Sequence, residues 1–158
     1  MTDREILLQI GKESGSKCRI TDDVDRWEEW NQCIREGIMA FGEDGRVTRL
    51  SFCGDDIPLL PECVGLLSAL IALEISDTPI RELPESIGNL SALEILDIYR
   101  TYITELPETI GKLSALKRLL LRELALEYLP ESIGNCLALE YLDISGTNQI
   151  CNETLLSE

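Results

Sequence analysis

The 158-residue chain contains no histidine. A Ser-His or Cys-His catalytic pair and an imidazole metal ligand are therefore excluded. Glycine-rich phosphate loops are also missing, and the acidic residues 22–25 lack the glycine and bidentate glutamate of a helix-loop-helix calcium site. Carboxylates are abundant, but nothing marks one of them as an acid with a raised pKa. We therefore expect no metal, no cofactor and no enzymatic activity.

Basic residues are scarce, because 14 Lys and Arg stand against 29 Asp and Glu, for a formal net charge of −15. Nucleic acids and anionic membranes need clustered Lys and Arg, so neither is an expected partner, and a basic protein surface is favoured instead. No apolar run approaches the ~18 residues of a membrane span. The short apolar stretch at residues 6–8 is no secretory signal. A cytoplasmic protein is predicted, although an effector exported without such a signal would look the same.

One tripeptide, Leu-Pro-Glu, recurs through most of the chain. Its leucines lie at a constant interval of 23 residues, at Leu60, Leu83, Leu106 and Leu129. A fixed period of about 20–50 residues predicts a solenoid, in which each unit stacks on its neighbours. Units starting near residues 47, 70, 93, 116 and 139 divide residues 47–150 into five repeats.

Each unit has the same order of apolar and turn-forming residues. In the second unit Leu73 and Ile75 are two residues apart, which places them on one face of a short strand. The Pro-Glu pair is typical of a helix start, because proline has no amide hydrogen to satisfy and glutamate is favourable near a helix N-terminus. Each unit therefore predicts a strand, a turn and a short helical or 3₁₀ segment.

The segments LPESIGNLSALEILDI and LPETIGKLSALKRLLL resemble leucine-rich repeats of the 23-residue intracellular type, also found in Ras-associated scaffold proteins and plant immune receptors. The resemblance implies an α/β repeat solenoid, a right-handed horseshoe whose concave face is a parallel sheet of about five strands. In this family an asparagine at the ninth repeat position bonds the backbone of neighbouring turns. Here that position holds Asp55, Thr78, Thr101, Leu124 and Thr147. Because Leu124 cannot form this bond, the fourth repeat is predicted to be the least regular.

Residues 1–46 are predicted to cap the open end of the solenoid, within one structural domain. We expect an amphipathic helical turn at residues 5–10 that ends near Gly11, and a helical stretch at residues 22–35 with Trp27 and Trp30 in the core of the cap. A hairpin should follow, with the first repeat strand as its second arm. Residues 151–158 form a tail that either folds over the last repeat or marks a cut chain.

The six cysteines include no closely spaced pair of the kind found in zinc or redox sites. Cys63 and Cys136 occupy repeat positions and are expected to be structural. Secreted plant relatives often carry a disulfide near the N-terminus, so a bond between Cys18 and Cys33 is the alternative to two free thiols. A reducing compartment disfavours it.

The residues between the core positions of each strand are expected on the concave face, in rows that cross the repeats about 5 Å apart. Part of this face combines aromatic, arginine and aliphatic side chains, which is the composition of an interaction hot spot. The predicted contact residues are Glu74, Ile95, Asp97, Tyr99, Arg100, Arg118, Leu120, Arg122, Tyr141 and Asp143. Two alternatives remain: these are scattered surface residues, or Asp77, Arg100 and Glu123 simply pair with each other.

The favoured function is a non-enzymatic, monomeric scaffold that binds a protein or peptide on the concave face. The resemblance implies partners such as a signalling GTPase, a kinase or phosphatase, or a host regulator if the protein is a pathogen effector. One alternative is a recognition segment of a larger signalling or immune receptor or effector. Another is a carbohydrate-acting enzyme or binder, which would need two carboxylates about 5–10 Å apart in a cleft.

Overall fold

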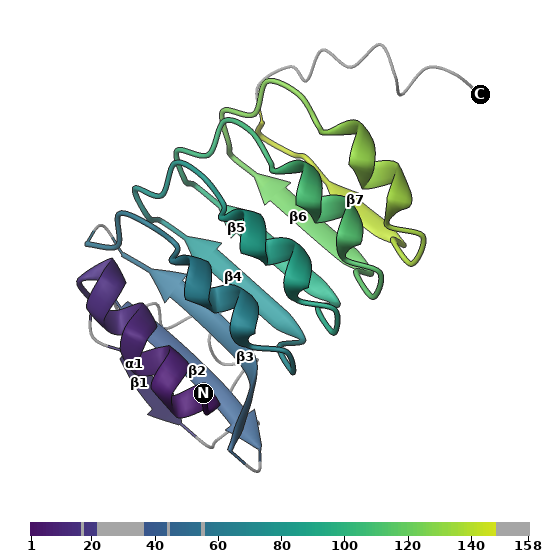
Figure 1. The fold of residues 1–158 in the computed structure, drawn as a ribbon. Coiled ribbons are helices and arrows are strands. Elements are labelled where there is room, and N and C mark those ends of the chain that lie inside the picture. The colour runs from purple at the N-terminus through teal and green to yellow at the C-terminus, as the bar shows by residue number, and fades with distance from the viewer. Residues whose placement is uncertain (17, 22–36, 44, 55, 148–158) are drawn as a thin grey trace.

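The computed structural model describes residues 1–16, 18–21, 37–43, 45–54 and 56–147. Seven strands form one sheet in chain order (Figure 1). The strands are β1 (Cys18–Thr21), β2 (Gly37–Glu43), β3 (Arg46–Cys53), β4 (Ala72–Ser76), β5 (Ile95–Tyr99), β6 (Arg118–Arg122) and β7 (Tyr141–Asp143). β1 is parallel to β2, β2 and β3 form an antiparallel hairpin, and β3 to β7 run parallel to one another.

The parallel strands β3 to β7 confirm the predicted repeat solenoid. Register partners across them are Leu50, Leu73, Leu96, Leu119 and Leu142, so each repeat lies one period from the next. Each of the first four repeats then forms a 3₁₀ helix: η2 (Glu62–Leu66), η3 (Glu85–Asn89), η4 (Glu108–Lys112) and η5 (Glu131–Asn135). Figure 1 shows these helices along one face of the sheet. The core lies between the two layers, where Leu73, Ile75 and Ile87 are fully buried.

Consecutive repeats approach one another closely at a glycine of each 3₁₀ helix. A Cβ atom added at Gly65, Gly88 or Gly111 would collide with backbone and side-chain atoms of a serine or threonine in the next repeat. A Cβ added at Gly134 would meet no atom of the described residues within 4 Å. The first three glycines are therefore required by the stacking of one repeat on the next.

The helix α1 (Asp3–Ser14) packs against η2 at the N-terminal end of the repeats. Its first turn is closed by a capping box, because Thr2 N donates to Glu5 Oε2 at 2.7 Å and Glu5 N donates to Thr2 Oγ1 at 3.3 Å. The helix extends past the predicted end near Gly11. Ser14 Oγ donates to a carbonyl one turn earlier, and Gly15, with φ 74°, provides the left-handed residue that ends the helix.

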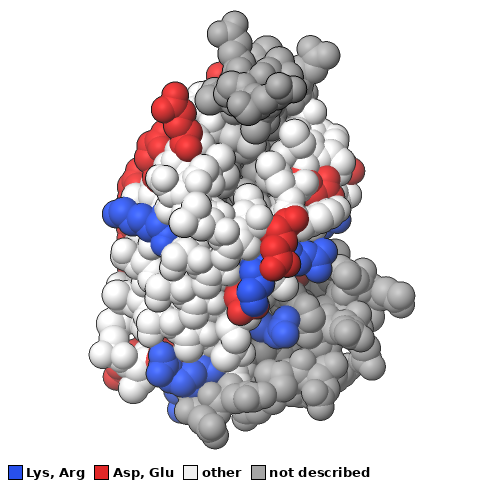
Figure 2. Space-filling model, turned by 90° about the vertical axis from the view of Figure 1, so that its right-hand side faces the viewer, with Lys and Arg blue, Asp and Glu red and all other residues white. Residues whose placement is uncertain are grey.

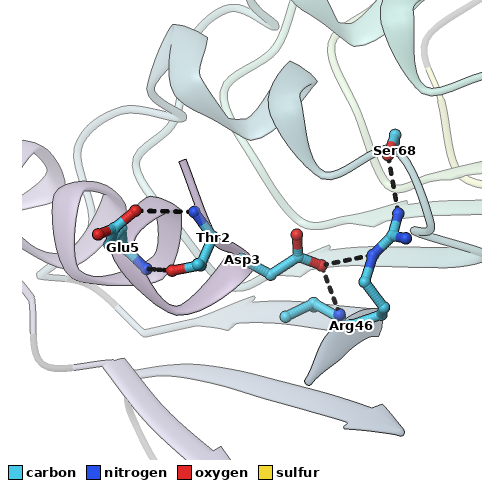
Figure 3. Close-up of polar contacts among 6 residues, drawn as sticks. Thr2, Asp3, Glu5, Arg46 and Ser68 are labelled. Atoms are coloured by element: carbon cyan, nitrogen blue, oxygen red, sulfur yellow. Dashed lines mark hydrogen bonds and ion pairs between the residues drawn. The ribbon is translucent and has the colours of Figure 1, made fainter. Parts of the chain in front are cut away.

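A buried carboxylate joins α1 to the hairpin and to the first repeat (Figure 3). Asp3 Oδ2 accepts a hydrogen bond from Val47 N at 2.7 Å and lies 3.6 Å from Arg46 Nε. Arg46 Nη2 in turn donates to Ser68 Oγ at 2.9 Å. Because three chain segments meet here, the orientation of the helix relative to the solenoid is defined by polar contacts as well as by apolar packing.

The predicted hairpin is confirmed by β2 and β3, whereas β1 had no counterpart in the sequence prediction. The predictions for residues 22–35, including Trp27 and Trp30, for the Cys18–Cys33 pair and for the C-terminal tail fall on residues or side chains outside those that the structure describes. Within the described ranges, no helix is both long and apolar enough to cross a membrane.

The prediction that the fourth repeat is the least regular is not supported by its strand and helix, but its turn, which contains Leu124, differs from that of the third repeat. Its strand β6 and its helix η5 have the same five-residue lengths as those of the preceding repeats. In the third repeat Ile103 N donates to Thr101 Oγ1 at 3.4 Å, and Tyr102 N donates to Ile80 O at 3.0 Å. In the fourth repeat the buried Leu124 cannot accept such a bond, and Glu127 N donates to Thr104 O at 3.2 Å. The apolar packing of Leu124 therefore replaces the side-chain bond in this turn.

Candidate functional site

The parallel register brings the predicted contact residues together on the sheet face opposite the 3₁₀ helices. This is the face that the sequence predicted to be concave, and it is called the outer sheet face below. Three rows of register partners cross the strands there: Ala72, Ile95, Arg118 and Tyr141; Glu74, Asp97, Leu120 and Asp143; and Ser76, Tyr99 and Arg122. A fourth row, Asp77, Arg100 and Glu123, directly follows the ends of β4, β5 and β6. Nine of the ten predicted residues lie in the first three rows, and Arg100 lies in the fourth.

Exposure on this face increases toward the C-terminal repeats. Ser51, Ala72 and Ser76, on β3 and β4, are buried, whereas Arg118 is exposed and Tyr141 keeps 49% of its surface exposed. Leu120, predicted to be exposed, is only 9% exposed. It is flanked by Asp97 and Asp143 on the neighbouring strands and by two arginines on its own strand, which explains its low exposure. The accessible part of the outer sheet face therefore belongs to β5, β6 and β7.

Arg122 is held between two neighbouring side chains of β5. Its Nη2 atom lies 2.9 and 2.8 Å from the two carboxylate oxygens of Asp97, and its guanidinium lies 5.5 Å from the ring centroid of Tyr99. The hydrogen bonds to Asp97 raise the pKa of Arg122 above its ordinary value. Because both contacts restrain the same group, the cation and the aromatic ring are fixed relative to each other before any partner arrives.

The row at the strand ends pairs within the molecule, as one of the alternatives predicted. Arg100 Nη1 lies 3.2 Å from Asp77 Oδ1, and Arg100 Nε lies 3.7 Å from Glu123 Oε2. Tyr99 also donates its hydroxyl to Glu123 Oε1 at 3.3 Å. Asp77 chiefly, with smaller contributions from Tyr99 and Glu123, raises the pKa of Arg100. These exposed charges form a ladder that borders the outer sheet face.

All three residues of this ladder have a left-handed backbone conformation. The φ angles are 50° for Asp77, 50° for Arg100 and 53° for Glu123, and the glycines at the equivalent positions 54 and 146 also have positive φ angles, of 114° and 68°. A left-handed residue other than glycine costs about 1–2 kcal/mol. Each of the three charged residues forms an ion pair with a neighbouring repeat from this conformation.

Three further charged residues of the outer sheet face, Arg118, Glu74 and Asp143, differ in the polar contacts that they form within the described part of the chain. Arg118 lies 5.4 Å from the ring centroid of Tyr141 and forms no ion pair among the described residues. Glu74 is half-buried and forms no hydrogen bond or ion pair within the described part of the chain. Burial raises the pKa of Glu74, and the charge of Asp97 raises it further. In contrast, the hydrogen bond from Ser145 N at 2.9 Å lowers the pKa of Asp143.

Paired opposite charges are common on other surfaces too. Figure 2 shows one side of the molecule where Lys and Arg side chains lie beside Asp and Glu side chains, while much of the described surface in between carries no charge. The exposed Lys117–Glu94 pair, at 2.9 Å, has the same character. Among the described residues no group of three or more Cys, Asp or Glu side chains could hold a metal ion.

The sequence prediction missed two adjoining grooves of about 260 and 500 Å³. They run along the Leu-Pro-Glu turns, on a different surface from the outer sheet face. Both include Glu62, Glu82 and Pro84 in their walls. The available signal in the sequence was one position of the repeat, which holds Leu59, Glu82 and Glu105 in the walls of the grooves and Tyr128 beside Glu105.

Comparison with known proteins agrees with this architecture. The family model described as leucine-rich repeat region matches residues 45–157. A leucine-rich repeat protein of Leptospira interrogans is 29% identical, with a TM-score of 0.57, over 70% of this chain and 27% of that chain. The leucine-rich repeat domain of the type III effector XopL is 30% identical, with a TM-score of 0.60, over 63% of this chain and 36% of that chain.

A chain of the BIR3–SERK2 complex from Arabidopsis thaliana shares the fold, with a TM-score of 0.61 and 20% identity over 96% of this chain and 97% of that chain. By contrast, the matches to the Leptospira protein and to XopL cover only 27% and 36% of those two chains. No curated protein sequence matches this chain.

Proposed function

Because this chain belongs to the leucine-rich repeat family, we propose that it is a non-enzymatic scaffold that binds a protein or peptide on the outer sheet face of β5, β6 and β7. The fold supports protein interaction in general. The contact site on this face, a cytoplasmic location and a monomeric state are our proposals. Residues 1–46 serve in this proposal as a cap for the solenoid.

The observation that carries the proposal is the fixed arrangement of two tyrosines and two arginines on neighbouring strands. Arg122 lies over Tyr99 and Arg118 lies over Tyr141, with centroid distances of 5.5 and 5.4 Å. Tyrosine and arginine are enriched among the residues that dominate binding energy at protein interfaces. Since stacking and ion pairing already restrict these side chains, binding would cost less ordering entropy than it would at a flexible surface.

Two of the similar structures agree with a role in recognition. One is a domain of a type III effector and another is a chain of a protein complex. This chain covers only part of the effector structure, so a recognition segment of a longer receptor or effector is the second candidate. In both cases the outer sheet face is the contact surface. The two candidates differ in whether this chain acts as a scaffold by itself or supplies partner recognition to a longer protein whose activity lies elsewhere.

A carbohydrate-acting enzyme has weaker support. Glu74 and Asp97 are register partners on adjacent strands, but neither of them lines one of the two grooves. Asp97 is also engaged by Arg122 at 2.8 Å. A general acid and a nucleophile both need access to substrate, and the ion pair with Arg122 blocks that access for Asp97.

The proposal is tested by affinity capture from lysate with the double variant Tyr99→Ala/Tyr141→Ala. The matched control is Leu66→Ala/Leu137→Ala, which removes two exposed apolar side chains outside the strands and outside the grooves. We expect quantitative mass spectrometry to show proteins captured by the wild type and by the control but at least tenfold depleted with the first variant. Equal capture by all three folded proteins would contradict binding through the outer sheet face.

A further inference from the structure

The grooves along the Leu-Pro-Glu turns form a second surface, separate from the outer sheet face. Their floor is apolar, because it contains the buried leucines of successive turns, Leu60, Leu83 and Leu106, together with their prolines. Their rim is acidic. It consists of Glu13, Glu62, Glu82, Glu85 and Glu105, with Arg81 as the only cation among the residues that line them. The rim therefore has a formal charge of −4.

Several of these charges are available to a partner. Glu62 accepts a hydrogen bond from Ser86 N at 3.1 Å, and Glu105 accepts one from Tyr128 Oη at 2.9 Å. Neither contact neutralises the carboxylate, because both donors are uncharged. Glu82 forms no hydrogen bond or ion pair among the described residues, and Arg81 is directed to Tyr102, with its guanidinium 5.5 Å from the ring centroid. The acidic rim is thus uncompensated within this part of the molecule.

The order of residues along the groove gives it a pattern. One position of the repeat holds Leu59, Glu82 and Glu105, which line the grooves, and then Tyr128, which lies next to them and donates its hydroxyl to Glu105. The two outer residues of this row, Leu59 and Tyr128, are 43% and 42% exposed. Two carboxylates are therefore flanked at both ends by exposed apolar side chains. On an extended peptide, alternate residues project from the same side, about 7 Å apart. Lysine and arginine also carry aliphatic stems that can cover an apolar floor while the charged group reaches the rim.

We propose that this groove docks an extended segment of a partner protein in which two basic side chains lie between two apolar ones. The basic groups pair with Glu82 and Glu105, and the apolar groups contact Leu59 and Tyr128. The occupant follows from charge complementarity with the acidic rim and from the apolar ends of the row. This surface is independent of the outer sheet face, so a scaffold using both would hold two partners, or two parts of one partner.

The test uses two fluorescent peptides of identical composition and charge. The matched peptide is Leu-Ala-Lys-Ala-Lys-Ala-Leu, and the permuted peptide is Lys-Ala-Leu-Ala-Leu-Ala-Lys. We expect fluorescence anisotropy at ~0.15 M salt, where exposed charges are substantially screened, to show at least fivefold tighter binding of the matched peptide. The variant Glu82→Gln/Glu105→Gln should remove this preference.

The matched control is Glu131→Gln/Glu140→Gln, which removes the same net charge from exposed glutamates outside the grooves. It should keep the preference for the matched peptide. Equal affinity for both peptides, no binding of either, or an equal effect of the two double variants would overturn the proposal. The variant Tyr99→Ala/Tyr141→Ala should bind the matched peptide like the wild type, so failure here is distinguishable from failure of the outer sheet face proposal.

Discussion

Arg122 and Asp97 come from neighbouring repeats and form a bifurcated hydrogen bond, in which Arg122 Nη2 lies 2.9 and 2.8 Å from the two carboxylate oxygens of Asp97. Their side chains are 37% and 23% exposed, so water screens this pair less than it screens the Lys117–Glu94 pair, whose side chains are 46% and 40% exposed. The two pairs have nearly equal distances, but the Arg122 pair is less exposed, and its guanidinium also contacts both carboxylate oxygens and lies over Tyr99.

The variant Arg122→Met should lower the free energy of unfolding by about 1–2 kcal/mol, because it leaves Asp97 partly buried beside Glu74 without its cation. The control Lys117→Met also replaces a cation with methionine, but at an exposed pair, and should change stability by at most about 0.5 kcal/mol. Urea unfolding followed by circular dichroism measures both. Equal losses would show that the Arg122 contact is no stronger than a surface ion pair.

Glu74 should make stability depend on pH. Burial and then Asp97 raise its folded-state pKa, so in the pH range between its unfolded and folded values the folded state binds more protons. Stability from this group is therefore complete below the unfolded pKa, which is about 4.3, and decreases as pH rises through the folded pKa. Glu74→Gln should be more stable than the wild type at pH 7, and this gain should vanish at pH 4. Thermal unfolding of both proteins between pH 4 and pH 7 tests the direction of this pH dependence. A stability gain of Glu74→Gln that persists at pH 4 would contradict the prediction.

The repeat period was sufficient to predict which strand residues of the first four repeats face the core, because stacked units bury the same positions. In the fifth repeat the equivalent Leu142 keeps 37% of its surface exposed. The repeat period did not predict exposure on the opposite face. Leu120 and Tyr141 are both uncharged outer-face residues, yet only the tyrosine is accessible, since exposure there depends on side chains of adjacent repeats. The left-handed conformation of Arg100 was also missed, although the glycines at the equivalent positions 54 and 146 were a readable signal.

The cysteine thiols of the repeats should be unreactive in the folded protein. Burial, with a further contribution from Glu13, raises the pKa of Cys63 to about 11, and burial raises the pKa of Cys136. The thiolate is the nucleophile, so at pH 8 only about one in a thousand Cys63 groups is reactive. Iodoacetamide labelling with peptide mass spectrometry should find Cys63 and Cys136 unmodified before denaturation and modified after it. Rapid labelling of Cys63 in the native protein would contradict this expectation.

The close contact between repeats predicts opposite outcomes for two chemically identical substitutions. In Gly111→Ala the new Cβ collides with Ser132, a backbone and side-chain contact that cannot relax without separating two repeats. In Gly134→Ala it meets no atom of the described residues within 4 Å. Both glycines lie at the same position of a 3₁₀ helix, so the change in intrinsic backbone preference is shared.

We expect Gly111→Ala to lower the free energy of unfolding by about 1–3 kcal/mol, as overpacking does in well-packed interiors. Gly134→Ala should be neutral or stabilise by up to about 1 kcal/mol, because alanine reduces the entropy of the unfolded chain. Chemical denaturation of the two variants beside the wild type measures the difference. If both variants lose the same stability, then backbone preference at this position, and not the contact with the next repeat, explains why glycine stands there.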